Sequence, residues 1–123
     1  MIETTFHLRP YEKLIVWKES YQLCLWIYKL TMKFPSDERF GIISQMRRSA
    51  YSVPINIAEG NMKSSRKEKA HFLEIAQSSL EELHCECKLS LDLQYLTIED
   101  FKKIDEQVNR VSYLLTKLRS AFL

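Results

Sequence analysis

Hydrophobic residues recur at spacings of three and four along most of the chain beyond residue 10. Such spacing places side chains on one face of an α-helix. Four segments carry the pattern, at about 11–34, 37–60, 65–95 and 98–122. The 123 residues include only two glycines and three prolines, and this scarcity of turn residues disfavours many short strands. The sequence therefore predicts an all-α protein.

Prolines and capping residues mark the ends of the predicted helices. Pro35 ends the first helix, because the residue before a proline is pushed out of the helical region. Ser36 can cap the second helix, although Gly41 and an alternative cap at Ser44 allow a later start.

The third and fourth helices have clearer starts. Ser65 is followed three residues later by Glu68, which is the pattern of a capping box, and Thr97 stands in the same relation to Asp100. Because all the connections are short, consecutive helices are expected to run antiparallel. We therefore predict an antiparallel up-down-up-down four-helix bundle that forms a single domain over residues 1–123.

The second predicted helix contains a proline within its apolar stripe. That stripe comprises Ile43, Met46, Ala50, Val53 and Ile57. Pro54 cannot donate a hydrogen bond to the Ala50 carbonyl, so we expect the helix axis to bend near Ala50–Pro54. We expect Gly60 to end the helix as a left-handed C-cap.

The first predicted helix is apolar on more than one face. One stripe at helical spacing is predicted to face the core: Leu14, Trp17, Tyr21, Cys24, Leu25, Tyr28 and Met32. A second apolar face predicts a subunit interface. Its candidate residues are Val16, Leu23, Trp26 and Ile27. The alternative is that Trp26 and its neighbours cover the edge of the bundle.

The segment QMRRSAYSVPINIAEG at 45–60 is similar to the signature of a family of bacterial four-helix-bundle proteins. These proteins are encoded in intervening sequences of large-subunit ribosomal RNA genes. The flanking segments FPSDERFG and FLEIAQSSLEEL also resemble the family pattern. The residues that match as structural motif positions are Gln45, Arg47, Arg48, Pro54, Asn56, Glu59 and Gly60. The resemblance implies a homopentameric ring, although nothing in the residue pattern itself fixes the number five.

A more distant resemblance reaches the pentameric accessory proteins of diversity-generating retroelements. It implies nucleic acid and a reverse transcriptase as partners.

Two Glu-x-x-His motifs occur in the chain, Glu68/His71 and Glu81/His84. Di-iron bundles use this spacing, but they need the two motifs on different helices. Here both lie on the predicted third helix, so we expect no di-metal site. We likewise expect no enzyme activity and no cofactor, because no glycine-rich phosphate loop or nucleophile elbow is present.

The three cysteines are Cys24, Cys85 and Cys87. Cys85 and Cys87 point in nearly opposite directions on a helix and cannot pair with each other. Cys24, His84 and Cys87 could meet, but a zinc site would need a fourth ligand. We expect three reduced thiols and no metal.

Asn56 and Glu59 allow two interpretations. They could form a polar site near the end of the second helix. Alternatively, Asn56 hydrogen-bonds a neighbouring helix while Glu59 forms an ion pair with a base such as Lys63. We favour the second interpretation, because buried polar groups in bundles usually fix packing.

The net charge of +2 conceals a segregation along the chain. Residues 28–69 hold nine Lys or Arg against four Asp or Glu, whereas residues 70–109 hold three against nine. In the predicted topology, seven basic residues converge on one end of the bundle, which we call the basic end. They are Lys13, Lys63, Arg66, Lys67, Lys69, Lys117 and Arg119.

The basic end is the candidate nucleic-acid contact, since basic side chains attract a phosphate backbone. The alternatives are a merely solvated surface, or a ring that serves as a protein-interaction scaffold without nucleic acid. No apolar run of about eighteen residues exists, so we expect no membrane contact. Residues 1–10 lack a signal-peptide core, which favours a cytoplasmic protein. The sequence thus favours a non-enzymatic, nucleic-acid-binding or RNA-associated accessory protein.

Overall fold

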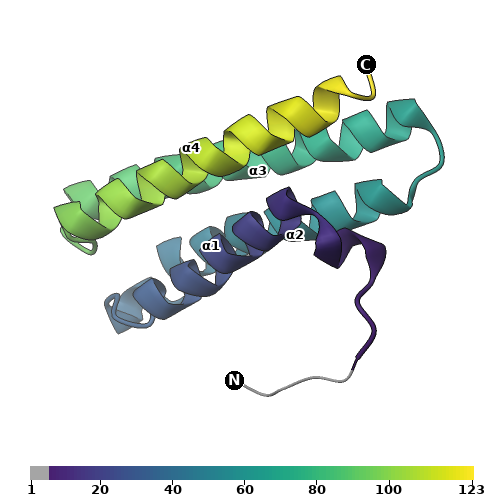
Figure 1. Ribbon diagram of the computed structural model, residues 1–123. Coiled ribbons are helices and arrows are strands. Elements are labelled where there is room, and N and C mark those ends of the chain that lie inside the picture. Colours follow the sequence, from purple (N-terminus) through teal and green to yellow (C-terminus); the bar gives the residue numbers. More distant parts are fainter. Residues whose placement is uncertain (1–5) are drawn as a thin grey trace.

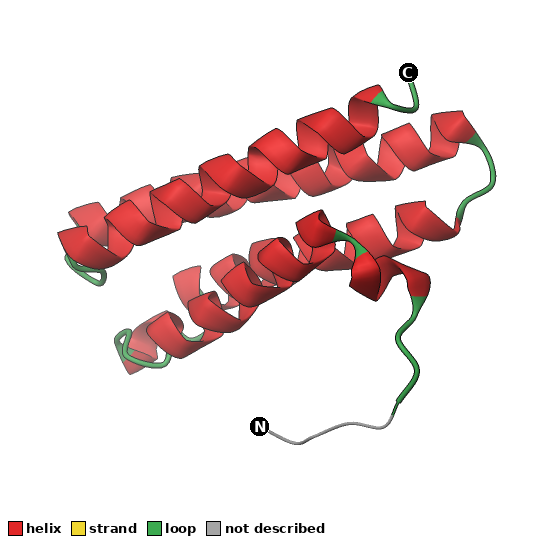
Figure 2. Ribbon diagram, in the orientation of Figure 1, coloured by secondary structure: helices red, strands yellow, loops and turns green. Residues whose placement is uncertain are grey.

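Four α-helices follow one another in the computed structural model, which describes residues 6–123 (Figures 1 and 2). Their bounds are α1 Ile15–Thr31, α2 Ile42–Met62, α3 Arg66–Asp92 and α4 Ile98–Ser120. Two short 3₁₀ turns precede α1 and α2, η1 Pro10–Lys13 and η2 Ser36–Glu38. No strand occurs in the described part of the chain, so the all-α prediction is confirmed.

The helices pack in the order of the chain. α1 packs on α2, α2 on α3 and α3 on α4, and α4 returns to α1 (Figure 1). The contact between α2 and α3 is the most extensive of the four. This arrangement confirms the predicted four-helix bundle with alternating helix directions.

All four helices contribute to one continuous apolar core. The largest side chains that are almost completely buried are Ile27, Met46, Val53, Ile57, Leu80, Leu83, Ile104, Val111 and Leu115. Burying each aliphatic side chain of this size favours folding by about 1.5–3 kcal/mol. The amphipathic pattern of the sequence is therefore the main source of the bundle's stability.

Two of the predicted caps are present. The Ser65 hydroxyl accepts a hydrogen bond from the Glu68 amide at 3.1 Å, and the Thr97 hydroxyl accepts one from the Asp100 amide at 3.1 Å. Each bond satisfies one of the amides that a helix start leaves without an intrahelical acceptor. These caps fix the starts of α3 and α4 within a residue of their predicted positions.

The first two helices are shorter than predicted. Leu14 is extended and separates η1 from α1, so the segment from residue 11 is not one continuous helix. α1 ends at Thr31, and the chain turns so that Phe34 is buried against the ring of Tyr95 at 5.3 Å. α2 begins only after Gly41, because Ser36 opens the short turn η2 instead of the long helix.

The prediction for the inner face of α1 was wrong. Val16, Leu23 and Ile27, predicted to form a subunit interface, are at most 5% exposed and lie in the core of the single chain. Tyr21 and Tyr28, predicted to face the core, are 40% and 37% exposed. Leu25 and Met32 from the same predicted stripe are also exposed. Cys24 from this stripe is buried, and Leu14 and Trp17 pack against the core, so the core contains residues of both predicted faces.

Two buried hydroxyl residues explain why the core face of α1 was predicted wrongly. Ser20 and Thr31 are at most 2% exposed and occupy the true inner face of α1. Thr31 donates to the Ile27 carbonyl at 2.8 Å, and Ser20 donates to the Trp17 carbonyl at 3.0 Å. A hydroxyl that bonds its own helix backbone in this way can be buried at little cost. In the sequence, these two polar residues interrupt the apolar pattern of the stripe that actually lies in the core.

Trp26, the fourth predicted interface residue, is half-buried beside a polar contact between α1 and α4. In that contact Arg110 forms an ion pair with Glu19, and Gln107 donates to the Glu19 carbonyl at 3.2 Å. The hydrogen bond from Arg110 lowers the pKa of Glu19. Trp26 therefore lies at the bundle edge, and its part in a subunit interface stays a prediction.

Gly60 does not end α2, because the helix continues to Met62 and none of the described residues is a glycine with positive φ. Gly60 is buried where α2 approaches α3. A Cβ atom at this position would lie 2.9 Å from the Cβ of Phe72. The glycine is required by close helix packing and not by a left-handed cap.

Pro54 lies inside α2, and the helix does not end there. Its side chain is buried. The bend that we expect near Ala50–Pro54 remains a prediction.

Gly60→Ala should lower the stability of the bundle. Alanine favours a helix interior by about 1 kcal/mol over glycine, but overpacking against Phe72 costs about 1–3 kcal/mol. Because that Cβ is fixed to the α3 backbone, we expect a net loss of about 1 kcal/mol and a lower Tm in thermal unfolding. Ser78→Ala on the exposed side of α3 is the control, and equal Tm values for the two variants would contradict the packing role.

The thiols should differ sharply in reactivity. Burial raises the pKa of Cys24 to about 11 and that of Cys87 to about 12, whereas Cys85 is exposed. Since the thiolate is the reactive form, the two buried thiols stay protonated and inert at pH 8. Mass spectrometry after iodoacetamide treatment should find one modified cysteine in the native protein and three after denaturation. Cys85→Ser should abolish native labelling, and rapid labelling of this variant would contradict the burial of the other two.

Candidate nucleic-acid interface

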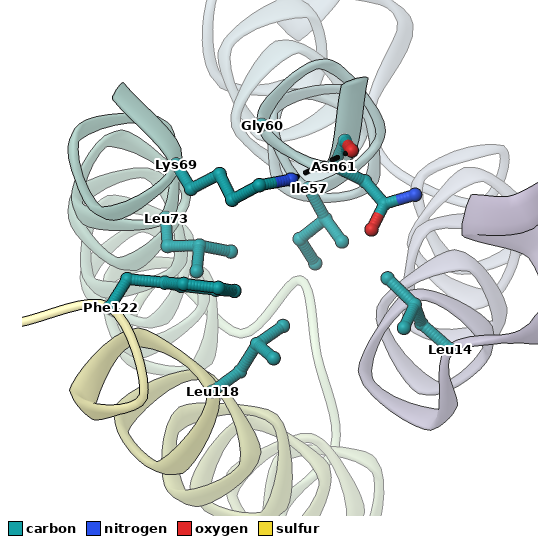
Figure 3. A pocket seen from close by; sticks show the side chains of 8 residues that line it. All are labelled: Leu14, Ile57, Gly60, Asn61, Lys69, Leu73, Leu118 and Phe122. Atoms are coloured by element: carbon teal, nitrogen blue, oxygen red, sulfur yellow. Dashed lines mark hydrogen bonds between the residues drawn. The ribbon is translucent and has the colours of Figure 1, made fainter. Parts of the chain in front are cut away.

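One end of the bundle brings together the start of α1, the turn between α2 and α3, and the end of α4. Figure 3 shows side chains from α2, α3, α4, the end of the chain after α4 and the residue before α1 around a common apolar centre. They include Leu14, Ile57, Leu73, Leu118 and Phe122. The space between them is only about 20 Å³, which is no more than a water molecule needs. This end is a packed platform and not a ligand pocket.

Two basic side chains of α3 hold the end of α4 on this platform. Arg66 donates to the Ala121 carbonyl at 2.6 Å, and its guanidinium lies 6.0 Å from the centre of the Phe122 ring. Lys69 donates to the Asn61 carbonyl at 3.0 Å and lies 5.7 Å from the same ring (Figure 3). Both cations therefore stabilise the fold as well as adding positive charge.

Arg119 of α4 is neutralised within the chain. Its guanidinium donates to the Glu74 carboxylate of α3 at 2.7 Å. Because the pair is partly exposed, its contribution to stability is small, about 0–1 kcal/mol. Arg119 consequently adds little to the positive charge available at this end.

The side chains of four lysines of the basic end form neither an ion pair nor a hydrogen bond within the described residues. Lys63 lies over the Phe72 ring at 5.1 Å, and Lys117 lies over the Tyr113 ring at 5.6 Å. Lys13 and Lys67 are exposed. Since cation–π contacts leave the charge intact, all four ammonium groups remain available to an anion.

A groove between the start of α3 and the end of α4 adds a residue that the sequence analysis missed. It has a volume of about 480 Å³, and His71 lines it together with Arg66, Lys67 and Arg119. Glu74 is the acidic residue in the same lining. His71 was passed over because it was weighed only as a metal ligand. Its place one turn after Lys67 on the exposed face of α3 could have indicated the groove.

The family-motif residues of α2 act mainly in packing. Arg47 donates to the Thr31 hydroxyl at 2.9 Å, and its guanidinium lies 4.8 Å from the centre of the Tyr28 ring. Arg48 donates to Glu82 of α3 at 2.6 Å, with Gln45 at the longer distance of 3.5 Å. These arginines tie α2 to its neighbours on both sides.

Asn56 and Glu59 do not form a shared polar site. The Asn56 amide donates to the Ser52 carbonyl at 2.8 Å and to the Ser52 hydroxyl at 3.0 Å. Ser52 in turn bonds Ser79 of α3 at 2.8 Å, so Asn56 reaches the neighbouring helix only indirectly. Glu59 is exposed, and the described residues include no ion pair between it and Lys63, so that part of the expectation was wrong.

Residues 6–123 contain no group of three or more His, Cys, Asp or Glu that could hold a metal ion. His84, from one of the Glu-x-x-His motifs, bonds Asp105 of α4 at 2.7 Å. Over the same residues, none of the helices combines the length and the hydropathy needed to cross a bilayer.

Comparison with known proteins agrees with the fold. A crystal structure of a protein of unknown function from the S23 ribosomal protein family of Bacteroides thetaiotaomicron superposes with a TM-score of 0.78. The two chains are 24% identical over 86% of this chain and 96% of the other, which supports the shared fold alone. No curated protein matches this chain.

The family itself is identified from sequence. The profile of the family described as 23S rRNA-intervening sequence protein matches residues 12–117, which span all but the last turn of the bundle. The chain therefore belongs to the 23S rRNA-intervening sequence protein family.

Proposed function

We propose that this protein is a non-enzymatic accessory protein that binds nucleic acid through the basic end. The observation that carries the proposal is the set of four lysine side chains with neither an ion pair nor a hydrogen bond among the described residues, Lys13, Lys63, Lys67 and Lys117. They come from three separate parts of the chain and meet on one packed platform. The family's association with 23S rRNA genes makes RNA the first candidate ligand, with DNA as the second.

Phosphate contacts of this kind have a recognisable physical signature. Each lysine that neutralises a phosphate releases a condensed counterion, so affinity falls linearly with the logarithm of the salt concentration. Such contacts carry no sequence information. The basic end should therefore bind many sequences and lose affinity steeply as salt rises.

A second candidate function is a protein-interaction scaffold, and a specific observation favours it. Met32 and Phe40 are 76% and 88% exposed at the end of the bundle opposite to the basic end. Exposed apolar side chains of this size are typical of protein contacts. We propose that this end contributes to a homo-oligomer, with five copies as the number that the family resemblance implies. A reverse transcriptase or another protein is the alternative partner for the same surface.

Charge reversal at the basic end should abolish nucleic-acid binding. We expect Lys63→Glu/Lys67→Glu/Lys117→Glu to reduce the slope of log affinity against log salt by about 3 and to weaken binding at least tenfold. These three lysines are chosen because Arg66 and Lys69 also hold the fold together. Fluorescence anisotropy with labelled RNA and DNA measures both quantities.

The matched control is Lys29→Glu/Lys102→Glu/Lys103→Glu, an equal change of charge toward the opposite end of the bundle. All three control lysines are exposed, so both variants should keep the helical circular dichroism and Tm of the wild type. If the two triple variants bind equally, or if the wild type binds neither RNA nor DNA at low salt, the proposal fails.

Self-association should depend on the apolar end. Multi-angle light scattering should give a mass above that of one 14.6 kDa chain, and Met32→Lys/Phe40→Lys should lower it. The control is Ile15→Lys/Tyr113→Lys, which changes two exposed apolar residues on α1 and α4 away from that end. A wild type that is monomeric at micromolar concentration would exclude the oligomer.

A further inference from the structure

A row of aromatic rings starts at the basic end and follows α1 away from it. The ring of Tyr11 meets the edge of Trp17 at 5.1 Å, and Trp17 stacks on Tyr21 at 4.6 Å with only 16° between the ring planes. Tyr28 lies two turns further along, beneath the guanidinium of Arg47. Tyr21 and Tyr28 are about two-fifths exposed. Bundle stability does not explain why such large rings are stacked at the surface.

The rings of Tyr11, Trp17 and Tyr21 form one wall of a hollow between α1 and α2, which we call the aromatic trough. Its volume is about 280 Å³. The lining residues are Tyr11, Trp17, Tyr21, Cys24, Tyr51, Pro54, Ile55 and Ala58. The last four of them come from α2 and form the opposite side.

The aromatic trough is continuous with the basic end. A second hollow of about 290 Å³ shares Tyr11 and Ala58 with the trough. It continues past Arg9 and Met62 to Asn61, whose carbonyl accepts the hydrogen bond from Lys69 at the basic end. A flexible chain held by phosphates at the basic end can therefore extend directly into the trough.

The charges around the aromatic trough favour an anionic chain. α2 contains no acidic residue from Ile42 to Ala58, while Arg47 lies at the far end of the row of rings. The acidic residue of α1, Glu19, is bound by Arg110 of α4 on the other side of the helix. Among residues 6–123, the acidic residues beside Tyr11 that oppose this field are Glu12 and Glu59.

We infer that the aromatic trough binds the unpaired bases of a single-stranded nucleic acid whose phosphates are held at the basic end. This inference rests on the proposed function and names its ligand class. Aromatic rings stack on bases of any sequence, but the bases must be free of a duplex to reach them.

The experiment uses Trp17 as the reporter. The chain has two tryptophans, and Trp26→Phe leaves Trp17 as the single tryptophan. The probes are a single-stranded 12-nucleotide oligouridine, an abasic strand of equal length and an RNA duplex. We expect the oligouridine to quench Trp17 emission, and the abasic strand and the duplex to leave it unchanged while still binding at low salt.

Two ring deletions test the same inference independently. Tyr21→Leu and Tyr51→Leu should each weaken binding of the single strand by about fivefold or more and leave duplex binding unchanged. Both residues are about 40% exposed, so leucine should not unfold the bundle. The control is Tyr113→Leu, which removes an exposed ring of α4 outside the trough.

The outcomes separate this inference from the proposed function. If single strand and duplex both bind in a salt-dependent way but Trp17 is not quenched and neither deletion matters, the trough inference fails while the basic end stands. If no nucleic acid binds, both fail. If Trp17 emission shifts to the red when the free protein is diluted, the trough is covered by a second copy of the chain, and the inference is overturned.

Discussion

The close approach of α2 to α3 is the contact on which the rest of this structure depends. Buried residues with small side chains lie in it on both helices. Gly60 of α2 packs against Phe72, while Ser79 and Ser90 of α3 bond Ser52 and Met46 of α2. Small side chains allow two helix axes to come near each other. A larger side chain in such a contact destabilises the fold. The missing Cβ of Gly60 is the extreme case, since Phe72 already occupies that space.

This contact determines where the charge lies. Because α2 and α3 are close at Gly60, the chain reverses over three residues, Lys63–Ser65, before α3 begins with a capped first turn. The short turn directs Lys63 and Lys67 to solvent while Arg66 and Lys69 reach back to the ends of α4 and α2. The same few residues therefore supply both the positive charge and the closure of the bundle end, which explains why only part of the basic end can be mutated without affecting the fold.

The parts of the fold that could be predicted from sequence are those governed by local chemistry. Ser65 and Thr97 cap helices because their hydroxyls lie three residues before an amide without an acceptor, and this relation is visible in the chain. The role of Gly60 could not be predicted, because it depends on Phe72 of another helix. The pairing of Arg119 with Glu74 was equally hidden, since the two residues are 45 positions apart. The roles of Gly60 and Arg119 thus depend on contacts with residues distant in the sequence, and not on local helix propensity.

The misassigned face of α1 is the most informative of these differences. Both faces carry apolar residues at helical spacing, so periodicity alone could not show which face lies in the core. The aliphatic face lies in the core, where Val16, Leu23 and Ile27 alternate with two small hydroxyl residues. The aromatic face lies at the surface. A sequence under selection for stability alone has little reason to keep stacked Trp17 and Tyr21 rings in contact with water. The face that pattern analysis misassigned is thus the face on which we propose that unpaired bases bind.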